Sequence, residues 1–177
     1  MMRFTMRNGV LTGNTNQQTQ AVLKGALVGP QKRIYAKDGT LALRTDIRRA
    51  TASKAQSGDV RAREYVLLTP SGNEYATARP GYSKEDDPAE VGWPIFRAPC
   101  VDHAHVFCDG NEYRLTAGKD LNYTLLDPSH RTVAEFRRKS LISGWDVEAE
   151  DGFPAEILCA IFVFCQYLRQ ENELHVV

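Results

Sequence analysis

The stretch that decides the fold is residues 154–170, which read PAEILCAIFVFCQYLRQ. Every residue from Ile157 to Cys165 is apolar, whereas a helix on a protein surface keeps one polar face. A helix that is apolar all round has to be enclosed, by protein or by lipid. Fully burying one Leu, Ile or Phe side chain gains about 1.5–3 kcal/mol, so enclosure is strongly favoured. This stretch therefore predicts a buried central helix.

The two ends of this helix are also marked in the sequence. Pro154 suits the first helical position, and Glu156 lies in the first turn, where the helix dipole favours a carboxylate. Asn172 is a plausible stop, so we predict a helix over residues 154–171 with a length of roughly 27 Å. A membrane-spanning helix needs about 20 apolar residues, and this apolar run is shorter. Enclosure by protein is therefore the favoured interpretation.

The rest of the chain reads as short strands joined by turns. Asp38-Gly39 lies between two strand-like runs, which predicts a hairpin with a type I′ turn. Trp145 to Glu150 alternates apolar and acidic residues, which is typical of a half-buried strand. The predicted hairpins are Arg33–Ala36 with Leu41–Arg44, Glu64–Thr69 with Glu74–Arg79, His105–Cys108 with Glu112–Thr116, and Leu121–Asp127 with Arg131–Arg137.

Three regions lack such a pattern. Residues 1–30 are weakly patterned, with a polar, turn-like segment over 12–20. Residues 46–62 are charged and small, and we expect a mobile surface loop there. Residues 80–92 are acidic and rich in turn-forming residues, and we expect a second loop.

One hairpin pattern occurs twice. Residues 65–79 and 123–137 both read Y-x-L-L-x-P-S-x4-A-x-x-R. Two copies do not make a solenoid, but they indicate one hairpin type reused in a closed or nearly closed sheet. A closed antiparallel barrel has no free edges, and its lumen has to be filled. The apolar C-terminal helix would fill it.

These hairpins, followed by a Gly-Trp-Asp-Val strand and a wholly apolar helix, resemble the tubby C-terminal domain-like superfamily. That group includes the tubby proteins, the phospholipid scramblases and the LURP-one-related proteins. The resemblance covers roughly residues 30–177 and is closest over Tyr123–Arg137 and Ser143–Leu168. It implies a mainly β fold, a closed antiparallel barrel of about twelve strands enclosing the C-terminal helix. It also implies association with membrane lipids, although no phosphoinositide-ligand motif matches residue by residue.

The composition is that of an ordinary globular protein. With 177 residues we expect a single domain over 1–177, and Lys+Arg and Asp+Glu are both 22, so the formal net charge is zero. No global field favours nucleic acid, and any anionic partner needs a local basic patch. The N-terminus lacks the apolar region of a signal peptide, so we expect a cytoplasmic protein with four reduced cysteines.

The densest basic cluster is Arg137-Arg138-Lys139. Such a cluster can hold anionic headgroups, because each Lys or Arg near an anionic membrane contributes about 1 kcal/mol. The alternative is an ordinary solvated strand end. The same two interpretations apply to the smaller basic clusters, which are Lys32-Arg33, Arg48-Arg49 and Arg61 with Arg63.

Cys100, His103, His105 and Cys108 are residue types that bind zinc. In a strand, however, the two histidines share one face and the two cysteines lie on the other, so one tetrahedral site would need a bulge. Cys159 and Cys165 lie about 240° apart around the helix, which makes them core residues rather than one site. The sequence contains no C-x-x-C, G-x-S-x-G or H-E-x-x-H motif and no phosphate-binding glycine loop.

We therefore expect a non-enzymatic binding module without a cofactor or metal, in which Arg137, Arg138 and Lys139 contact an anionic phospholipid or membrane surface. The first alternative is a protein-interaction or scaffold domain without a small ligand. The second is a metal-dependent enzyme around His103 and His105. The oligomeric state stays open.

Overall fold

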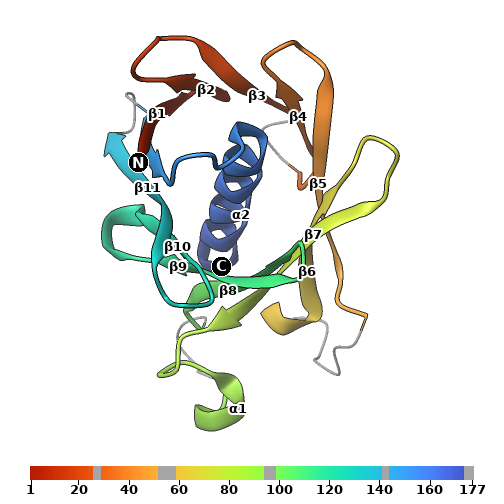
Figure 1. The fold of residues 1–177 in the computed structure, drawn as a ribbon. Helices are drawn as coiled ribbons and strands as arrows, with labels where there is room; N and C mark the ends of the chain where they lie inside the picture. The colour runs from red at the N-terminus through yellow and green to blue at the C-terminus, as the bar shows by residue number, and fades with distance from the viewer. Residues whose placement is uncertain (26–28, 52–58, 94–98, 141–143, 174–177) are drawn as a thin grey trace.

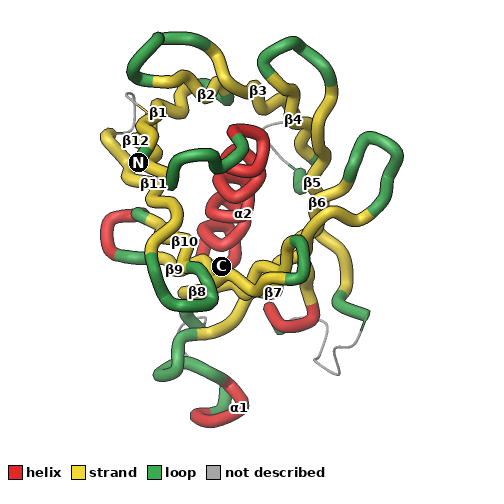
Figure 2. Tube along the Cα trace, viewed as in Figure 1, coloured by secondary structure: helices red, strands yellow, loops and turns green. Residues whose placement is uncertain are grey.

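The computed structural model describes residues 1–25, 29–51, 59–93, 99–140 and 144–173. Within these ranges twelve antiparallel strands close into a barrel around one long helix, α2 (Ala155–Glu173), as Figures 1 and 2 show. This confirms the predicted fold class. The strands are β1 (Met2–Arg7), β2 (Val10–Gly13), β3 (Thr19–Gly25), β4 (Lys32–Ala36), β5 (Leu41–Arg49), β6 (Arg63–Leu68), β7 (Glu74–Tyr82), β8 (Val101–Cys108), β9 (Asn111–Ala117), β10 (Tyr123–Leu126), β11 (Thr132–Ser140) and β12 (Gly144–Ala149).

Strands that are consecutive in the sequence are neighbours in the barrel. The barrel closes where β1 pairs with β12, with Met2 opposite Ala149 and Met6 opposite Trp145. Every strand therefore has a hydrogen-bonded partner on both sides, and the sheet has no free edge.

The first 30 residues are more regular than we predicted, because they contain β1, β2 and β3. Asn8 and Gly9 have φ values of 50° and 77° and join Arg7 to its partner Val10. This is the two-residue turn that an Asn-Gly dipeptide favours, and the strong hairpin signal was present in the sequence. The N-terminal strands complete the barrel wall.

The loop predicted over residues 46–62 is wrong for its first part, since β5 continues to Arg49 and pairs with β6. On the outer face, the Arg48 side chain of this segment is paired with a carboxylate of the neighbouring strand β6: its Nε donates to Glu64 Oε2 at 2.9 Å. A strand with a polar outer face needs no apolar run. A 3₁₀ turn follows at Val60–Ala62, and residues 52–58 lie outside the described residues.

The loop predicted over residues 80–92 is also partly wrong. β7 extends through Pro80, which lies opposite Ala104, to Tyr82. The register shifts between Gly81 and Tyr82, and such an irregularity accommodates a proline that cannot donate a hydrogen bond. The short helix α1 (Pro88–Val91) follows and is capped by Asp87.

The predicted type I′ turn at Asp38-Gly39 is wrong in type, although the hairpin exists. Gly39 has a φ of 84°, and Asp38 is not among the residues with positive φ. The Gly39 N–H donates to the Ala36 carbonyl, and the Ala36 N–H donates to the Thr40 carbonyl, both at 2.9 Å. This is a type I turn followed by one left-handed residue, which forms a bulge.

The repeated sequence pattern corresponds to a repeated turn of this same kind. Residues 69–73 and 127–131 make the equivalent pair of backbone hydrogen bonds. Gly72 and His130 occupy the left-handed position, with φ values of 92° and 60°. The register shift in β6–β7 lies at Leu67/Leu68, and that in β10–β11 lies at Leu125/Leu126.

The core forms between α2 and the inner face of the barrel. On one side of the helix, Phe162 packs against Trp145 with ring centroids 5.3 Å apart. On the other side, Phe164 and Tyr167 pack against Tyr65, at 5.8 Å and 5.1 Å. α2 is thus covered all round, as its apolar sequence requires. Its limits differ from the predicted ones by one or two residues.

No described helix is both long and apolar enough to cross a membrane.

Candidate functional site

The structure does not present Arg137, Arg138 and Lys139 as one free basic cluster, because the three side chains differ in exposure and two of them are ion-paired. Strand alternation exposes Arg137 and Lys139, whereas Arg138 is half-buried. Carboxylates neutralise the exposed pair: Arg137 forms an ion pair with Glu135, and Lys139 Nζ lies 2.7 Å from Asp146 Oδ1. Arg138 is held through its backbone N–H, which donates to the Asn122 side chain. The three cations therefore present little uncompensated charge.

The basic cluster of Arg61 and Arg63 is ion-paired in the same way. Arg61 Nη2 lies 2.7 Å from Asp59, and its Nη1 lies 3.0 Å from Asp87. The Asp59–Arg61 pair favours both charged forms, so the pKa of the Asp59 carboxyl is lowered although its partial burial opposes this. Arg63 contacts the buried Glu171 at the end of α2, at 2.6 Å. These arginines are committed to structural contacts.

Uncompensated charge gathers instead on the outer face of β3, β4 and β5. Lys24 lies directly opposite Arg33, and Arg33 lies directly opposite Arg44. Like charges directly opposite one another destabilise a sheet. This row of cations therefore lowers the stability of the folded barrel. A surface with no role beyond folding would not be expected to place three like charges opposite one another.

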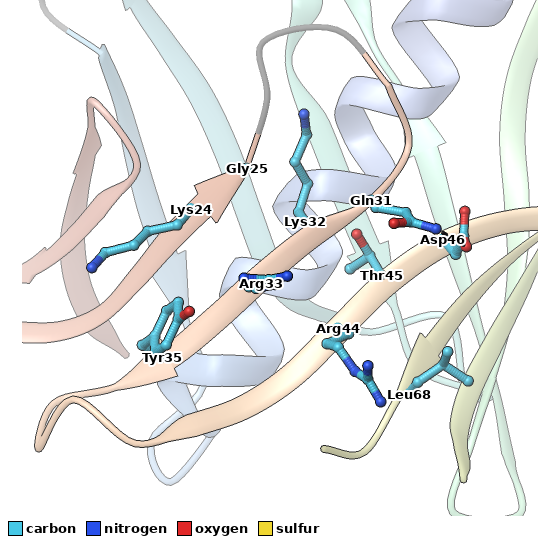
Figure 3. Close-up of a pocket in the computed structure, with 10 residues that line it drawn as sticks. All are labelled: Lys24, Gly25, Gln31, Lys32, Arg33, Tyr35, Arg44, Thr45, Asp46 and Leu68. Carbon is cyan, nitrogen blue, oxygen red and sulfur yellow. Dashed lines mark hydrogen bonds between the residues drawn. The ribbon is translucent and has the colours of Figure 1, made fainter. Parts of the chain in front are cut away.

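Within the described ranges, none of these three side chains forms an ion pair with a carboxylate. The Arg44 Nη2 donates to the Pro70 carbonyl at 2.8 Å, while its Nε is buried without a hydrogen-bond partner. The Lys24 ammonium lies over the Tyr35 ring, 5.0 Å from its centroid. Arg33 is exposed between them. Figure 3 shows the three side chains on adjacent strands.

The row borders a cavity of about 470 Å³, which we call the β3–β5 pocket. Gly25 leaves room here, because a Cβ at this position would lie 2.7 Å from Cδ of the Lys32 side chain. Asp46 is the one carboxylate among the described residues that line the pocket, and it accepts a hydrogen bond from the Gln31 amide at 3.0 Å. The lining residues are Lys24, Gly25, Gln31, Lys32, Arg33, Tyr35, Arg44, Thr45, Asp46 and Leu68 (Figure 3).

This pocket is tied to the central helix. Thr45 faces inward from β5, and its Oγ1 lies 2.8 Å from the hydroxyl of Tyr167 on α2. The Tyr167 hydroxyl also donates to the Pro30 carbonyl, at the entry to β4. The core therefore fixes the floor of the pocket. With four cations and one carboxylate in its lining, the pocket is suited chemically to a phosphate or another multiply charged anion.

The predicted split of the segment from Cys100 to Cys108 holds for His103, His105 and Cys108, whereas Cys100 lies exposed before β8 begins. His103 and His105 lie on the outer face, with ring centroids 5.2 Å apart, while Cys108 lines a cavity inside the barrel. Each Nδ1 lies 2.6 Å from a carboxylate oxygen, of Asp102 and Glu112 respectively. Among the described residues, no three His, Cys, Asp or Glu side chains are placed to hold a metal ion.

His103 has a structural role in this arrangement. Its Nε2 lies so close to Gly81 on β7 that a Cβ there would be only 2.5 Å away. The ring thus covers the glycine across the strand pair, and its second nitrogen faces backbone rather than an open site. Cys159 and Cys165 are buried on α2, and burial raises the pKa of the Cys159 thiol to about 12. These thiols are core residues, as predicted.

No family model and no curated protein matches the sequence. A protein from Arabidopsis thaliana, solved by X-ray crystallography, is similar over 95% of this chain and 91% of its own, with 12% sequence identity and a TM-score of 0.36.

Proposed function

We propose that the protein is a non-enzymatic module that binds anionic membrane lipid through the β3–β5 pocket. The observation that carries this proposal is the row of Lys24, Arg33 and Arg44, three cations opposite one another on adjacent strands without carboxylate partners among the described residues. A phosphate placed over this row would relieve the repulsion between the cations. The tubby-like resemblance of the sequence supports the same class of ligand, and membership of that family is part of the proposal.

The chemistry of the side chains fits a phosphorylated headgroup. Two arginines offer planar forks that bind phosphate oxygens with two parallel hydrogen bonds. The buried Arg44 Nε still lacks a partner, and a bound oxygen could accept its hydrogen. Leu68 at the edge of the pocket and the ring of Tyr35 give the headgroup an apolar border.

Liposome co-sedimentation tests this proposal. The triple variant Lys24→Gln/Arg33→Gln/Arg44→Gln removes three charges, each contributing about 1 kcal/mol near an anionic membrane. We expect the wild-type protein to bind phosphatidylcholine vesicles that contain phosphatidic acid or phosphatidylserine, and less so at physiological than at low salt. The variant should lose affinity by a factor on the order of 100.

The matched control is Arg137→Gln/Arg138→Gln/Lys139→Gln, which removes the same number of charges from the cluster that the sequence alone favoured. We expect this control to bind nearly as well as the wild-type protein, because its two exposed cations are already neutralised by Glu135 and Asp146. If the control lost binding and the β3–β5 variant kept it, the earlier cluster would be the lipid site. No binding by the wild-type protein would overturn the lipid proposal.

One observation favours a protein partner as the second candidate. α1 projects from the barrel (Figure 1), and Val91, its last residue, and Trp93, two residues further on, are 60% and 51% exposed. Trp93 makes an edge-to-face contact with Tyr82, which holds it in place. If a scaffold role is correct, Val91→Ser/Trp93→Ser should release a protein that co-purifies from cells with the wild-type chain, while lipid binding stays unchanged.

The cytoplasmic location also remains a prediction, and fractionation of cells that express the tagged full chain tests it. The metal-dependent enzyme is the least supported candidate, because both histidines are engaged by carboxylates and His103 packs on Gly81.

A further inference from the structure

A second cavity lies inside the barrel, between the first turns of α2 and the inner wall formed by β6 to β10. Its volume is about 320 Å³, at the lower end of the range of roughly 300–1,000 Å³ that is usual for small-molecule sites. The deep part is lined by buried apolar side chains, which are Leu67, Ala76, Val106, Leu125, Ile161 and Phe164. The cavity and the β3–β5 pocket share no lining residue among the described ones.

The mouth of this cavity is acidic. Asp109, Glu150 and Asp151 line it, and no Lys, Arg or His is among the described residues that do so. Tyr75 adds a hydroxyl, which lies 3.5 Å from Asp109 Oδ2. The N-terminal ammonium of Met1 contacts Asp151 at 3.3 Å, and the Arg131 guanidinium, which pairs with Asp127, also interacts electrostatically with Glu150. Asp109 and Glu150 form no ion pair with another described residue.

This arrangement selects one class of ligand. An alkyl chain can enter the apolar depth, where burying each CH₂ contributes about 0.8 kcal/mol. A carboxylate or phosphate head would face three carboxylates, whereas a protonated amine would be attracted by them. Because the carboxylates lie at the mouth and the buried apolar side chains line the depth, the head and the alkyl chain of such a ligand are directed to opposite ends of the cavity.

We propose that this cavity binds a primary-amine amphiphile, with the alkyl chain between α2 and the barrel wall and the ammonium at Asp109 and Glu150. The site is independent of the proposed membrane-lipid function, and it takes the opposite head charge.

Isothermal titration of the full chain with decylamine and decanoate below their critical micelle concentrations, and with decanol below its solubility limit, tests the proposal. We expect the amine to bind most tightly, the alcohol more weakly and the carboxylate not at all. Asp109→Asn/Glu150→Gln should weaken amine binding roughly fivefold to tenfold and leave alcohol binding unchanged. Asparagine tolerates the positive φ of 49° at position 109, so the fold should be kept. The control Glu85→Gln/Asp120→Asn removes two acidic groups elsewhere.

Thiol alkylation gives a second readout on the unmodified protein. Cys108 lines the cavity, and Cys100 lies exposed at the start of the same strand. Decylamine should slow alkylation of Cys108 and leave Cys100 unaffected, which peptide mass spectrometry can follow. Equal affinity for the amine and the alcohol, or unchanged alkylation of Cys108 at saturating amine, would overturn the proposal.

Discussion

At the scale of single residues, the core depends on the apolar side chain of Phe162 and on the paired carboxylate of Glu171, both of which are buried. Phe162 lies between Trp145 and Phe136, with ring centroids 5.3 Å and 6.3 Å away. Glu171 is the charged counterpart: it is buried, and its carboxylate is held by Arg63 and faces the Tyr65 hydroxyl. Burying an unpaired charge costs several kcal/mol, whereas Glu171 is paired.

We predict that Phe162→Asp prevents soluble expression, because it places an unpaired carboxylate between the helix and the barrel wall. Phe107→Asp is the matched control, since Phe107 on β8 is exposed and contacts Arg79 on the outer face. The fraction of soluble protein after expression measures both. A folded and soluble Phe162→Asp protein would contradict the enclosed-helix structure.

At the scale of elements, the same turn is built three times with different residues at its left-handed position. Gly39 and Gly72 fill that position in two hairpins, and His130 fills it in the third. At this position a side chain such as that of His130 costs about 1 kcal/mol relative to glycine, because its Cβ crowds the following carbonyl. The third hairpin is therefore the one that can be improved.

Replacing His130 with glycine should raise the free energy of unfolding by about 0.5–1 kcal/mol, because it relieves this strain. The reverse exchange, Gly72→His, should lower it by a similar amount. Urea denaturation followed by circular dichroism provides both numbers. The changes in the free energy of unfolding of His130→Gly and Gly72→His must have opposite signs. A loss of stability in His130→Gly would show that the turns are not equivalent.

At the scale of the whole molecule, the barrel keeps several ionisable groups out of water. Desolvation raises the pKa of Tyr65, Tyr123 and Tyr167, and it raises the pKa of the Cys165 thiol well above its ordinary value of 9.0. A group whose pKa is raised by folding stabilises the native state below its unfolded pKa and loses that contribution as the pH rises.

Stability should therefore fall as the pH rises from about 9 to above 10, the ordinary pKa values of these thiols and phenols. Tyr65, Tyr123 and Tyr167 should ionise together with unfolding. Absorbance at the phenolate band and circular dichroism, recorded on one pH series, measure this. Full phenolate absorbance with an unchanged circular dichroism spectrum would contradict the burial of these side chains.

Much of the fold could be predicted from the sequence, because the apolar helix and the hairpin turns are local signals. The lengths of β5 and β7 could not, since Arg48 and Pro80 fit a strand only through partners far along the chain. The hairpin predicted for Arg33–Ala36 and Leu41–Arg44 implies that Arg33 lies opposite Arg44, so this part of the β3–β5 pocket could have been predicted from the sequence. Lys24 was not, because residues 1–30 lacked a predicted strand, and the pairing of Arg137 and Lys139 with carboxylates depends on cross-strand register.

The most direct test of the central claim is to locate the anion on the protein. We would titrate the ¹⁵N-labelled full chain with dihexanoyl phosphatidic acid, a soluble lipid, and follow amide chemical shifts. Our account predicts saturable shifts at Lys24, Arg33 and Arg44 and their neighbours on β3, β4 and β5, with little change over Arg137 to Lys139. Shifts centred on Arg137 to Lys139, or none that saturate on the outer face of β3 to β5, would contradict it.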